Sequence, residues 1–192
     1  MLNRKALAIG LLLSDFPSLV NCFESIVRPN FEVMQQAMDK FGQGFDWANH
    51  EVHTEDGYIL NMFRLVKGDG SRNPIEGEPI LIMHGMSSNG SRFINRQYDS
   101  MDGLAISLAK AGYDVWLGNN RGTIFSNEHE KLDWAVDEEE YWDFSFPELG
   151  MFDLPAMVET VVEETNGRKV RYIGTSLGTT QMFYALQANR TK

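Results

Sequence analysis

A pentapeptide of the form Gly-x-Ser-x-Gly occupies residues 174–178, directly after the short apolar run 170–173 and directly before a helix-like stretch at 179–188. A strand, a sharp turn and a helix in this order form a nucleophile elbow, which holds the serine hydroxyl at the top of a sheet. The turn is so tight that a side chain at Gly174 or Gly178 would collide with backbone, and Ser176 is expected at strained φ and ψ. The motif therefore restricts the chain to folds in which a strand runs directly into a helix.

The elbow closes a regular alternation of strand and helix signals. Three short apolar runs indicate strands that are buried on both faces, at residues 80–83, 113–117 and 170–173. Apolar residues follow helical spacing at 101–109 and again after Asp153, which is predicted to cap a helix with Pro155 in its first turn. The alternation predicts an α/β fold with a mostly parallel sheet and right-handed crossovers.

Upstream of this alternation the pattern is different. Residues 30–41 carry apolar side chains on one helical face, and residues 52–54 and 59–66 indicate two strands joined by the turn Glu55-Asp56-Gly57. We therefore expect a helix and then an antiparallel hairpin ahead of the parallel strands. The acidic run 137–140 is interpreted as a solvated loop.

Charge and cysteine content exclude several classes of function. The chain has a net charge of −10 and no basic stripe to neutralise phosphates, so we expect no nucleic-acid partner. Cys22 is its one cysteine, which rules out an internal disulfide and a cysteine-based zinc site. His50 and His53 fit no metal-binding motif and are interpreted as structural or surface residues. The cysteine and histidine pattern therefore predicts no metal site, and the sequence contains no apolar run long enough for a transmembrane helix.

A serine at an elbow becomes a nucleophile only with help from other groups. A histidine must take its proton, a carboxylate must orient that histidine, and two N–H donors must stabilise the oxyanion. One donor in such sites is the residue after the serine, here Leu177, and the other follows an earlier buried strand, here in the turn His84-Gly85-Met86. Gly85 would let the backbone swing inward, so that the Met86 N–H points at the oxyanion.

His84 and His129 are not expected to act as the general base. Both precede Ser176 in the chain, whereas hydrolases built on a strand, an elbow and a helix supply their histidine last, in the order Ser, Asp or Glu, His. His84 is interpreted instead as a residue that shapes the oxyanion loop by hydrogen bonding.

Taken together, the motifs resemble the eukaryotic acid lipase family, which includes the gastric and lysosomal acid lipases. The resemblance covers residues 46–192 in order, with matching blocks at 50–60, 81–86, 112–122, 142–148, 153–156 and 172–180. One departure lies in the elbow, where the family usually has His-Ser-Gln and this chain has Thr175-Ser176-Leu177. The change keeps the N–H after the serine but loses a side-chain hydrogen bond that could position the loop.

The resemblance implies an α/β-hydrolase fold and hydrolysis of the acyl esters of neutral lipids, such as triacylglycerols or sterol esters, at a lipid–water interface without metal or cofactor. It implies Ser176 as the nucleophile and Met86 and Leu177 as the oxyanion donors. It also implies a structural role at the site for four residues, which are His84, Gly85, Gly174 and Gly178. The family's lid, triad aspartate and triad histidine are expected beyond Lys192. The hydrolase fold is therefore expected to be incomplete and to end just after the elbow helix.

The N-terminus resembles a secretory signal, because Arg4 and Lys5 precede a short apolar run and then small and polar residues. An amphipathic or buried helix remains the alternative. Family members usually enter the secretory pathway, which implies a lysosomal or extracellular location. Asn89 and Asn189 begin glycosylation sequons. The expected segments are a signal peptide at 1–22, a helical or linker segment at 23–45 and the incomplete hydrolase core at 46–192.

Three interpretations of function stay open at this stage. The first is a lipase, the second is a catalytically inactive fragment that at most binds lipid or a partner, and the third is a hydrolase of soluble esters. Loss of the triad base should remove roughly 10⁴- to 10⁶-fold of the rate. We also expect the elbow strand to lie on an open, aggregation-prone sheet edge. The sequence pattern indicates no oligomeric state.

Overall fold

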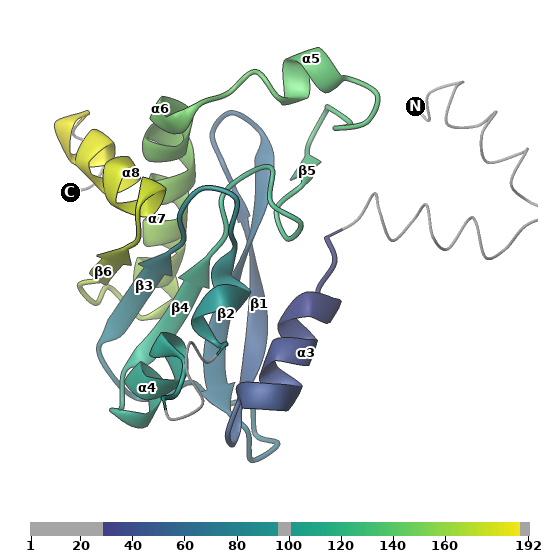
Figure 1. Ribbon diagram of the computed structural model, residues 1–192. Helices are drawn as coiled ribbons and strands as arrows, with labels where there is room; N and C mark the ends of the chain where they lie inside the picture. The colour runs from purple at the N-terminus through teal and green to yellow at the C-terminus, as the bar shows by residue number, and fades with distance from the viewer. Residues whose placement is uncertain (1–28, 96–100, 189–192) are drawn as a thin grey trace, which may run out of the picture.

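The computed structural model of the chain describes residues 29–95 and 101–188. Its strands form a six-stranded sheet in the order β1-β2-β4-β3-β6, with β5 paired to β2 (Figure 1). The strands are β1 Phe45–His53, β2 Tyr58–Lys67, β3 Pro79–Met83, β4 Asp114–Gly118, β5 Glu128–His129 and β6 Arg171–Gly174. β3 pairs in parallel with β4 and with β6, and the other pairs are antiparallel. The prediction of a hairpin followed by parallel strands is confirmed.

Helices cover both faces of this sheet. Figure 1 shows α3 and α4 on one side of the strands and α7 and α8 on the other. The helical elements are α3 Glu32–Phe41, the 3-10 helix η1 Gly90–Phe93, α4 Leu104–Lys110, α5 Glu138–Tyr141, α6 Phe146–Glu148, the π-helix η2 Leu149–Asp153, α7 Leu154–Glu164 and α8 Leu177–Gln187. The described part of the chain is therefore a three-layer α/β arrangement.

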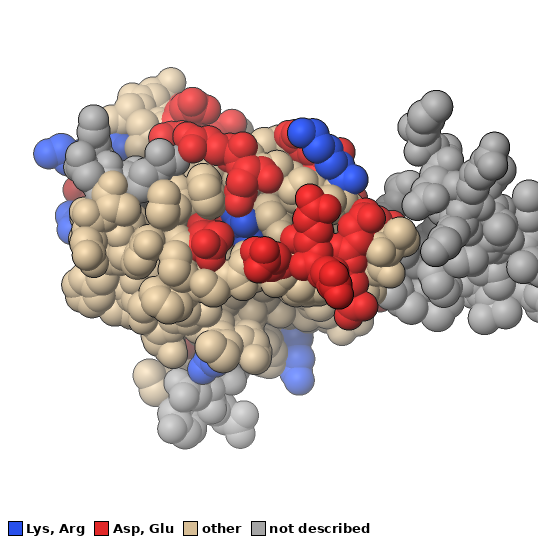
Figure 2. All heavy atoms as spheres, turned by 90° about the horizontal axis from the view of Figure 1, so that it is seen from above, with Lys and Arg blue, Asp and Glu red and all other residues tan. Residues whose placement is uncertain are grey.

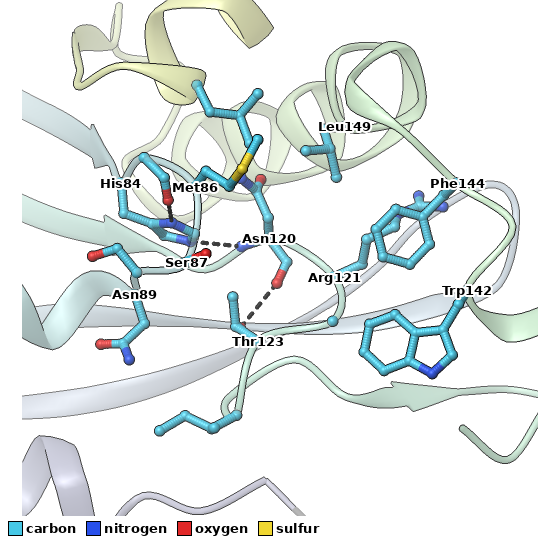
Figure 3. Close-up of a pocket in the computed structure, with 15 residues that line it drawn as sticks. His84, Met86, Ser87, Asn89, Asn120, Arg121, Thr123, Trp142, Phe144 and Leu149 are labelled. Atoms are coloured by element: carbon cyan, nitrogen blue, oxygen red, sulfur yellow. Dashed lines mark hydrogen bonds between the residues drawn. The ribbon is translucent and has the colours of Figure 1, made fainter. Parts of the chain in front are cut away.

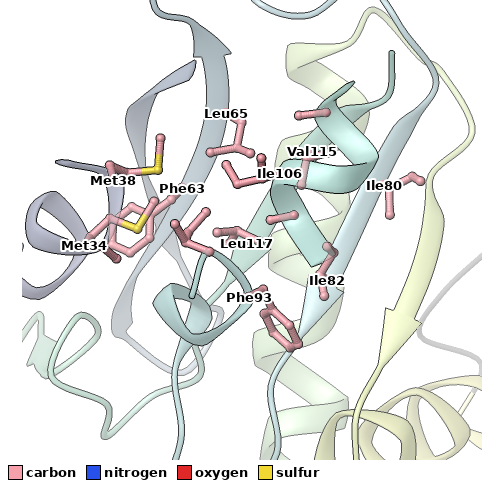
Figure 4. Packing of buried hydrophobic residues seen from close by; sticks show 14 of the residues in the cluster. Met34, Met38, Phe63, Leu65, Ile80, Ile82, Phe93, Ile106, Val115 and Leu117 are labelled. Atoms are coloured by element: carbon pink, nitrogen blue, oxygen red, sulfur yellow. The ribbon is translucent and has the colours of Figure 1, made fainter. Parts of the chain in front are cut away.

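Two hydrophobic cores follow from the alternation of side chains along the strands. Ile80 and Ile82 of β3 face the core beneath α3 and α4, where Figure 4 shows them with Val115 and Leu117 of β4. Leu81 of β3 belongs to the other core, under α7 and α8. Because successive strand residues point to opposite faces, one apolar run supplies both layers.

Burial divides the parallel strands into central and edge strands. All residues of β3 and β4 are buried, whereas β6 has one exposed and three half-buried residues. Among the described strands, β6 pairs with β3 alone. The strand that leads into the elbow is thus an edge strand of the sheet described, as expected.

Two local predictions are wrong. Residues 138–140 are not loop but part of the short helix α5. Asp153 does not cap a helix, because its backbone is already helical at φ −64° and ψ −53° and its side chain makes no cap hydrogen bond. The π-helix η2 runs directly into α7, so no N-terminus exists there to be capped.

The N-terminal predictions are tested only in part. The proposed signal peptide at 1–22 and the sequon that begins at Asn189 lie outside the described residues. Helix α3, from the segment 23–45, packs on the core through Met34, Ala37 and Met38. Within residues 29–95 and 101–188, the structure contains no helix that is long and apolar enough to cross a membrane.

Candidate active site

The turn between β6 and α8 has the geometry of a nucleophile elbow. Ser176 lies in it with φ 53° and ψ −115°, a region that residues other than glycine rarely adopt, and its side chain is exposed. A Cβ on Gly174 would lie 2.8 Å from the carbonyl carbon of Gly178, and a Cβ on Gly178 would lie 2.8 Å from the Met83 carbonyl oxygen. Both contacts are with backbone atoms that cannot easily move, so this turn requires glycine on each side of the serine.

The loop after β3 packs directly against Ser176. The Thr175 N–H donates to the Met83 carbonyl at 3.0 Å, which aligns the end of β6 with the end of β3. A Cβ on Gly85 would lie only 3.1 Å from the Ser176 Cβ and 3.3 Å from the Thr175 carbonyl oxygen. A side chain at Gly85 would therefore push the loop away from the serine. The structure thus brings the predicted oxyanion loop and the predicted nucleophile together.

His84 is buried and uses both ring nitrogens inside the protein. Nδ1 lies 2.7 Å from the Gly85 carbonyl oxygen, and Nε2 lies 3.2 Å from the backbone nitrogen of Asn120 (Figure 3). Because the carbonyl can only accept and the N–H can only donate, the ring is neutral and carries its proton on Nδ1. Burial lowers the pKa of His84, although the hydrogen bond to Gly85 opposes that shift. His84 therefore fastens the loop and has no nitrogen left to take a proton from serine.

A cavity of about 520 Å³ opens beside the elbow, between the loops that follow β3 and β4. Gly85, Met86 and Leu177 line it, so both predicted oxyanion residues face the same space. Trp142 and Phe144 form an aromatic wall opposite His84 (Figure 3). Met86 is 74% exposed and Trp142 is 42% exposed, so the mouth of the cavity is apolar and open to solvent.

The other three histidines are engaged away from Ser176. His50 packs on the Trp116 ring at a centroid distance of 4.6 Å, and His53 pairs with Glu51 and Glu130. His129 accepts the N–H groups of residues 131 and 132 on Nδ1. Among the described residues, none of the four histidines is hydrogen-bonded to the Ser176 hydroxyl, and no group of three His, Cys, Asp or Glu side chains could hold a metal.

A buried ion cluster supports the far wall of the cavity. Arg121 follows β4 and donates from Nη1 and Nη2 to both carboxylate oxygens of Asp56 at 2.6 and 2.9 Å. Its Nε and backbone N–H donate to Asp153 at 2.7 and 2.9 Å, and its guanidinium carbon lies 3.8 Å from the Tyr58 ring centre. Complete burial raises the pKa of Asp153 to about 6, against the opposing charge of Arg121. The cluster joins the hairpin turn, the loop after β4 and the start of α7.

Sequence reasoning missed this cluster as well as the π-helix η2. Arg121 lies 65 residues from Asp56 and 32 from Asp153, and no local pattern connects residues so far apart. Their presence in blocks that resemble the acid lipases was the one available signal. The η2 residue Leu149 lines the cavity, in keeping with the frequent occurrence of π-helices at functional sites.

Comparison with known proteins agrees with this geometry. Residues 40–97 match the family model described as a partial alpha/beta-hydrolase lipase region, and residues 78–192 match the model of the alpha/beta hydrolase fold. An esterase from Pyrococcus furiosus superposes with a TM-score of 0.52 at 18% identity, over 78% of this chain and 48% of that one. That likeness shows the fold alone.

The curated relatives are lipases. Gastric triacylglycerol lipase from Rattus norvegicus is 38% identical over 77% of this chain and 37% of its own length. Lipase member M from Mus musculus is 38% identical over 74% of this chain and 33% of its own length. A putative lysosomal acid lipase/cholesteryl ester hydrolase from Crotalus adamanteus is 39% identical over 74% of this chain and 35% of its own length. The chain thus spans about a third of the length of these relatives. It belongs to the acid lipase family of α/β-hydrolases.

Proposed function

We propose that this chain supplies the nucleophile, the oxyanion hole and part of the acyl cavity of a serine hydrolase that cleaves acyl esters of neutral lipids. The observation that carries the proposal is the Ser176 backbone, which is held at φ 53° between β6 and α8 and packed against Gly85 at the edge of an apolar cavity. Backbone strain of this kind is retained where function needs it.

In the proposed reaction, the Ser176 hydroxyl oxygen attacks the ester carbonyl carbon while a base removes its proton. The carbonyl oxygen becomes an oxyanion, which the N–H groups of Met86 and Leu177 stabilise. Collapse of this intermediate expels the alcohol, which takes up the proton, and leaves an acyl-serine. Water then attacks the acyl-serine, releasing the fatty acid and restoring the hydroxyl group.

The general base and its carboxylate partner are proposed to be residues that this chain does not contain. His84 has no free ring nitrogen, and the other three histidines are bonded or packed elsewhere. The chain by itself is therefore expected to be a very slow catalyst, which is the second interpretation of the sequence. Family membership also supports a proposed secretory route to the lysosome or the cell exterior, since relatives carry gastric and lysosomal names.

Surface charge favours neutral over anionic lipids as substrates. Figure 2 shows Asp and Glu side chains gathered on the end of the molecule that carries α5, where Glu138, Glu139 and Glu140 are exposed. A negative field at this end repels anionic head groups, and it leaves an uncharged ester free to enter the apolar cavity. Exposed Met86 and Trp142 at the cavity mouth suit contact with a lipid–water interface.

Alkyl p-nitrophenyl phosphonates test the proposal, because they form a stable bond to an activated serine. The 192-residue chain and its Ser176→Ala variant are incubated with butyl and decyl phosphonates, and the labelled residue is located by mass spectrometry. We expect slow labelling at Ser176 that is faster with the decyl reagent, and no labelling of the variant. Faster reaction with the butyl reagent would favour soluble esters. Labelling confined to another residue would contradict the nucleophile assignment.

A further inference from the structure

Asn120 is a buried polar residue in the wall of the proposed acyl cavity. It follows β4 and is 3% exposed. Its backbone N–H donates to His84 Nε2 at 3.2 Å, and its carbonyl accepts the Thr123 hydroxyl at 2.9 Å. Both backbone groups are therefore held in place. Figure 3 shows its side chain directed toward Met86, between His84 and Leu149.

The orientation of the Asn120 amide follows from its neighbour Gln181. Gln181 Nε2 donates to the Leu149 carbonyl at 2.8 Å and to Asn120 Oδ1 at 2.9 Å. A backbone carbonyl can only accept, so Gln181 must present its nitrogen there and Asn120 must present its oxygen to that nitrogen. The Asn120 Nδ2 group is consequently turned away from Gln181.

Asn120 Nδ2 is a buried donor with no hydrogen-bond partner among the described residues, and the only other unpartnered atom of this amide pair is Gln181 Oε1. Leaving a buried donor unpaired is unfavourable, and native proteins rarely do so without a reason. Ser87, Ser88 and Thr123 also line this cavity, but none of their hydroxyl groups accepts a hydrogen bond from Nδ2. An oxygen atom of a bound molecule would satisfy this donor.

The position of Asn120 indicates which oxygen that is. Through its backbone, Asn120 contacts His84, which directly precedes Gly85 and Met86; through its side chain, it contacts Gln181. Gln181 lies four residues after Leu177, on the same face of α8. Asn120 thus bridges the two segments that carry the proposed oxyanion donors.

We propose that the Asn120 side-chain amide donates a third hydrogen bond to the carbonyl oxygen of the bound ester, so that this cavity selects esters over ethers of equal chain length. This inference rests on the proposed function, because it uses the same cavity. It also gives the proposed oxyanion hole a hydrogen-bonding side chain, whereas the side chain of Leu177 is apolar.

Binding without turnover separates this inference from the hydrolase proposal. Calorimetry on the full 192-residue chain compares monooctanoylglycerol with its octyl ether, which lacks the carbonyl oxygen. One hydrogen bond predicts that the ester binds about fivefold more tightly than the ether. Asn120→Asp at pH 8 keeps an oxygen for Gln181 but removes the donor, and Asn120→Leu removes both groups. Both variants should bind the ester no better than the ether, while the control Asn73→Asp on an exposed loop keeps the preference.

A spectroscopic readout excludes a purely structural role for Asn120. In ¹⁵N-labelled chain, the Asn120 side-chain NH₂ resonances should shift with the ester and stay in place with the ether. An ester preference that survives in both Asn120 variants would overturn the inference and leave the cavity as a lipid site. Equal binding of ester and ether by the unaltered chain would also overturn it. Failure to bind either molecule would refute the neutral-lipid proposal and the inference together.

Discussion

The strained backbone of Ser176 predicts that glycine at this position makes the protein more stable than alanine does. Ser176→Gly and Ser176→Ala both delete the hydroxyl group, so they lose the same chemistry. They differ in the backbone, because glycine adopts φ 53° and ψ −115° readily whereas alanine retains the strain. The pair therefore isolates the conformational cost of holding a nucleophile in this turn.

The magnitude follows from two opposing effects. A non-glycine residue in a sparsely populated region costs about 1 to 3 kcal/mol. Glycine also loses more conformational entropy on folding than alanine does, which destabilises the glycine variant by about 0.5 to 1 kcal/mol. We therefore expect the free energy of unfolding of Ser176→Gly to be higher than that of Ser176→Ala by about 1 kcal/mol. For a chain of this size, the difference corresponds to about 2 to 4 °C in Tm.

Urea unfolding of both variants, followed by circular dichroism, measures the difference directly. Thr180, which is exposed on the regular helix α8, provides the matched control. There the order should reverse, with Thr180→Gly less stable than Thr180→Ala by about 1 kcal/mol. If glycine were equal to or worse than alanine at position 176 as well, the strained-elbow argument would be refuted.

The other predictions concern packing and pH. Gly178→Ala should lower the unfolding free energy by about 1 to 3 kcal/mol in urea titrations, because its Cβ would overlap the Met83 carbonyl oxygen. The control Thr180→Ala should change the unfolding free energy by no more than about 0.5 kcal/mol. Equal effects of the two substitutions would contradict the tight turn at Gly178. The Asp153 pKa is about 6 when folded and 3.8 ordinarily, so the native state binds more protons between these values. Its contribution to stability should fall by on the order of 2 kcal/mol as pH rises from 4 to 6. The difference in unfolding free energy between the unaltered chain and Asp153→Asn should show this fall. A rise would mean that the charge of Arg121 outweighs burial and lowers the pKa of Asp153.

The central sheet and the elbow could be predicted because local pattern determines them. Residues 80–83 and 113–117 are continuous apolar runs, and burial on both faces of β3 and β4 requires such runs. The elbow requires small residues at fixed offsets, so the presence of Gly174 and Gly178 in the sequence already indicates close backbone contacts at these two positions. These features need no information from distant parts of the chain.

Features that depend on long-range pairing could not be predicted. Asp153 fits the pattern of a helix cap, but it binds Arg121 from inside a continuous helix. The Asn120–Gln181 amide pair joins residues 61 positions apart. Buried polar groups have no periodicity, and only the folded chain shows which of them meet. The acidic run 138–140 forms α5 because Tyr141, at the end of that turn, is buried.

Chemical rescue by imidazole tests most directly the claim that Ser176 is a nucleophile whose base lies outside this chain. The second-order rate constant for decyl phosphonate labelling is measured on the 192-residue chain with and without imidazole, with Ser176→Ala as the control. The account predicts labelling at Ser176 whose rate rises in proportion to unprotonated imidazole, which supplies the missing base. Fast labelling that imidazole does not change would show that a residue of this chain already acts as the base, and it would contradict the account.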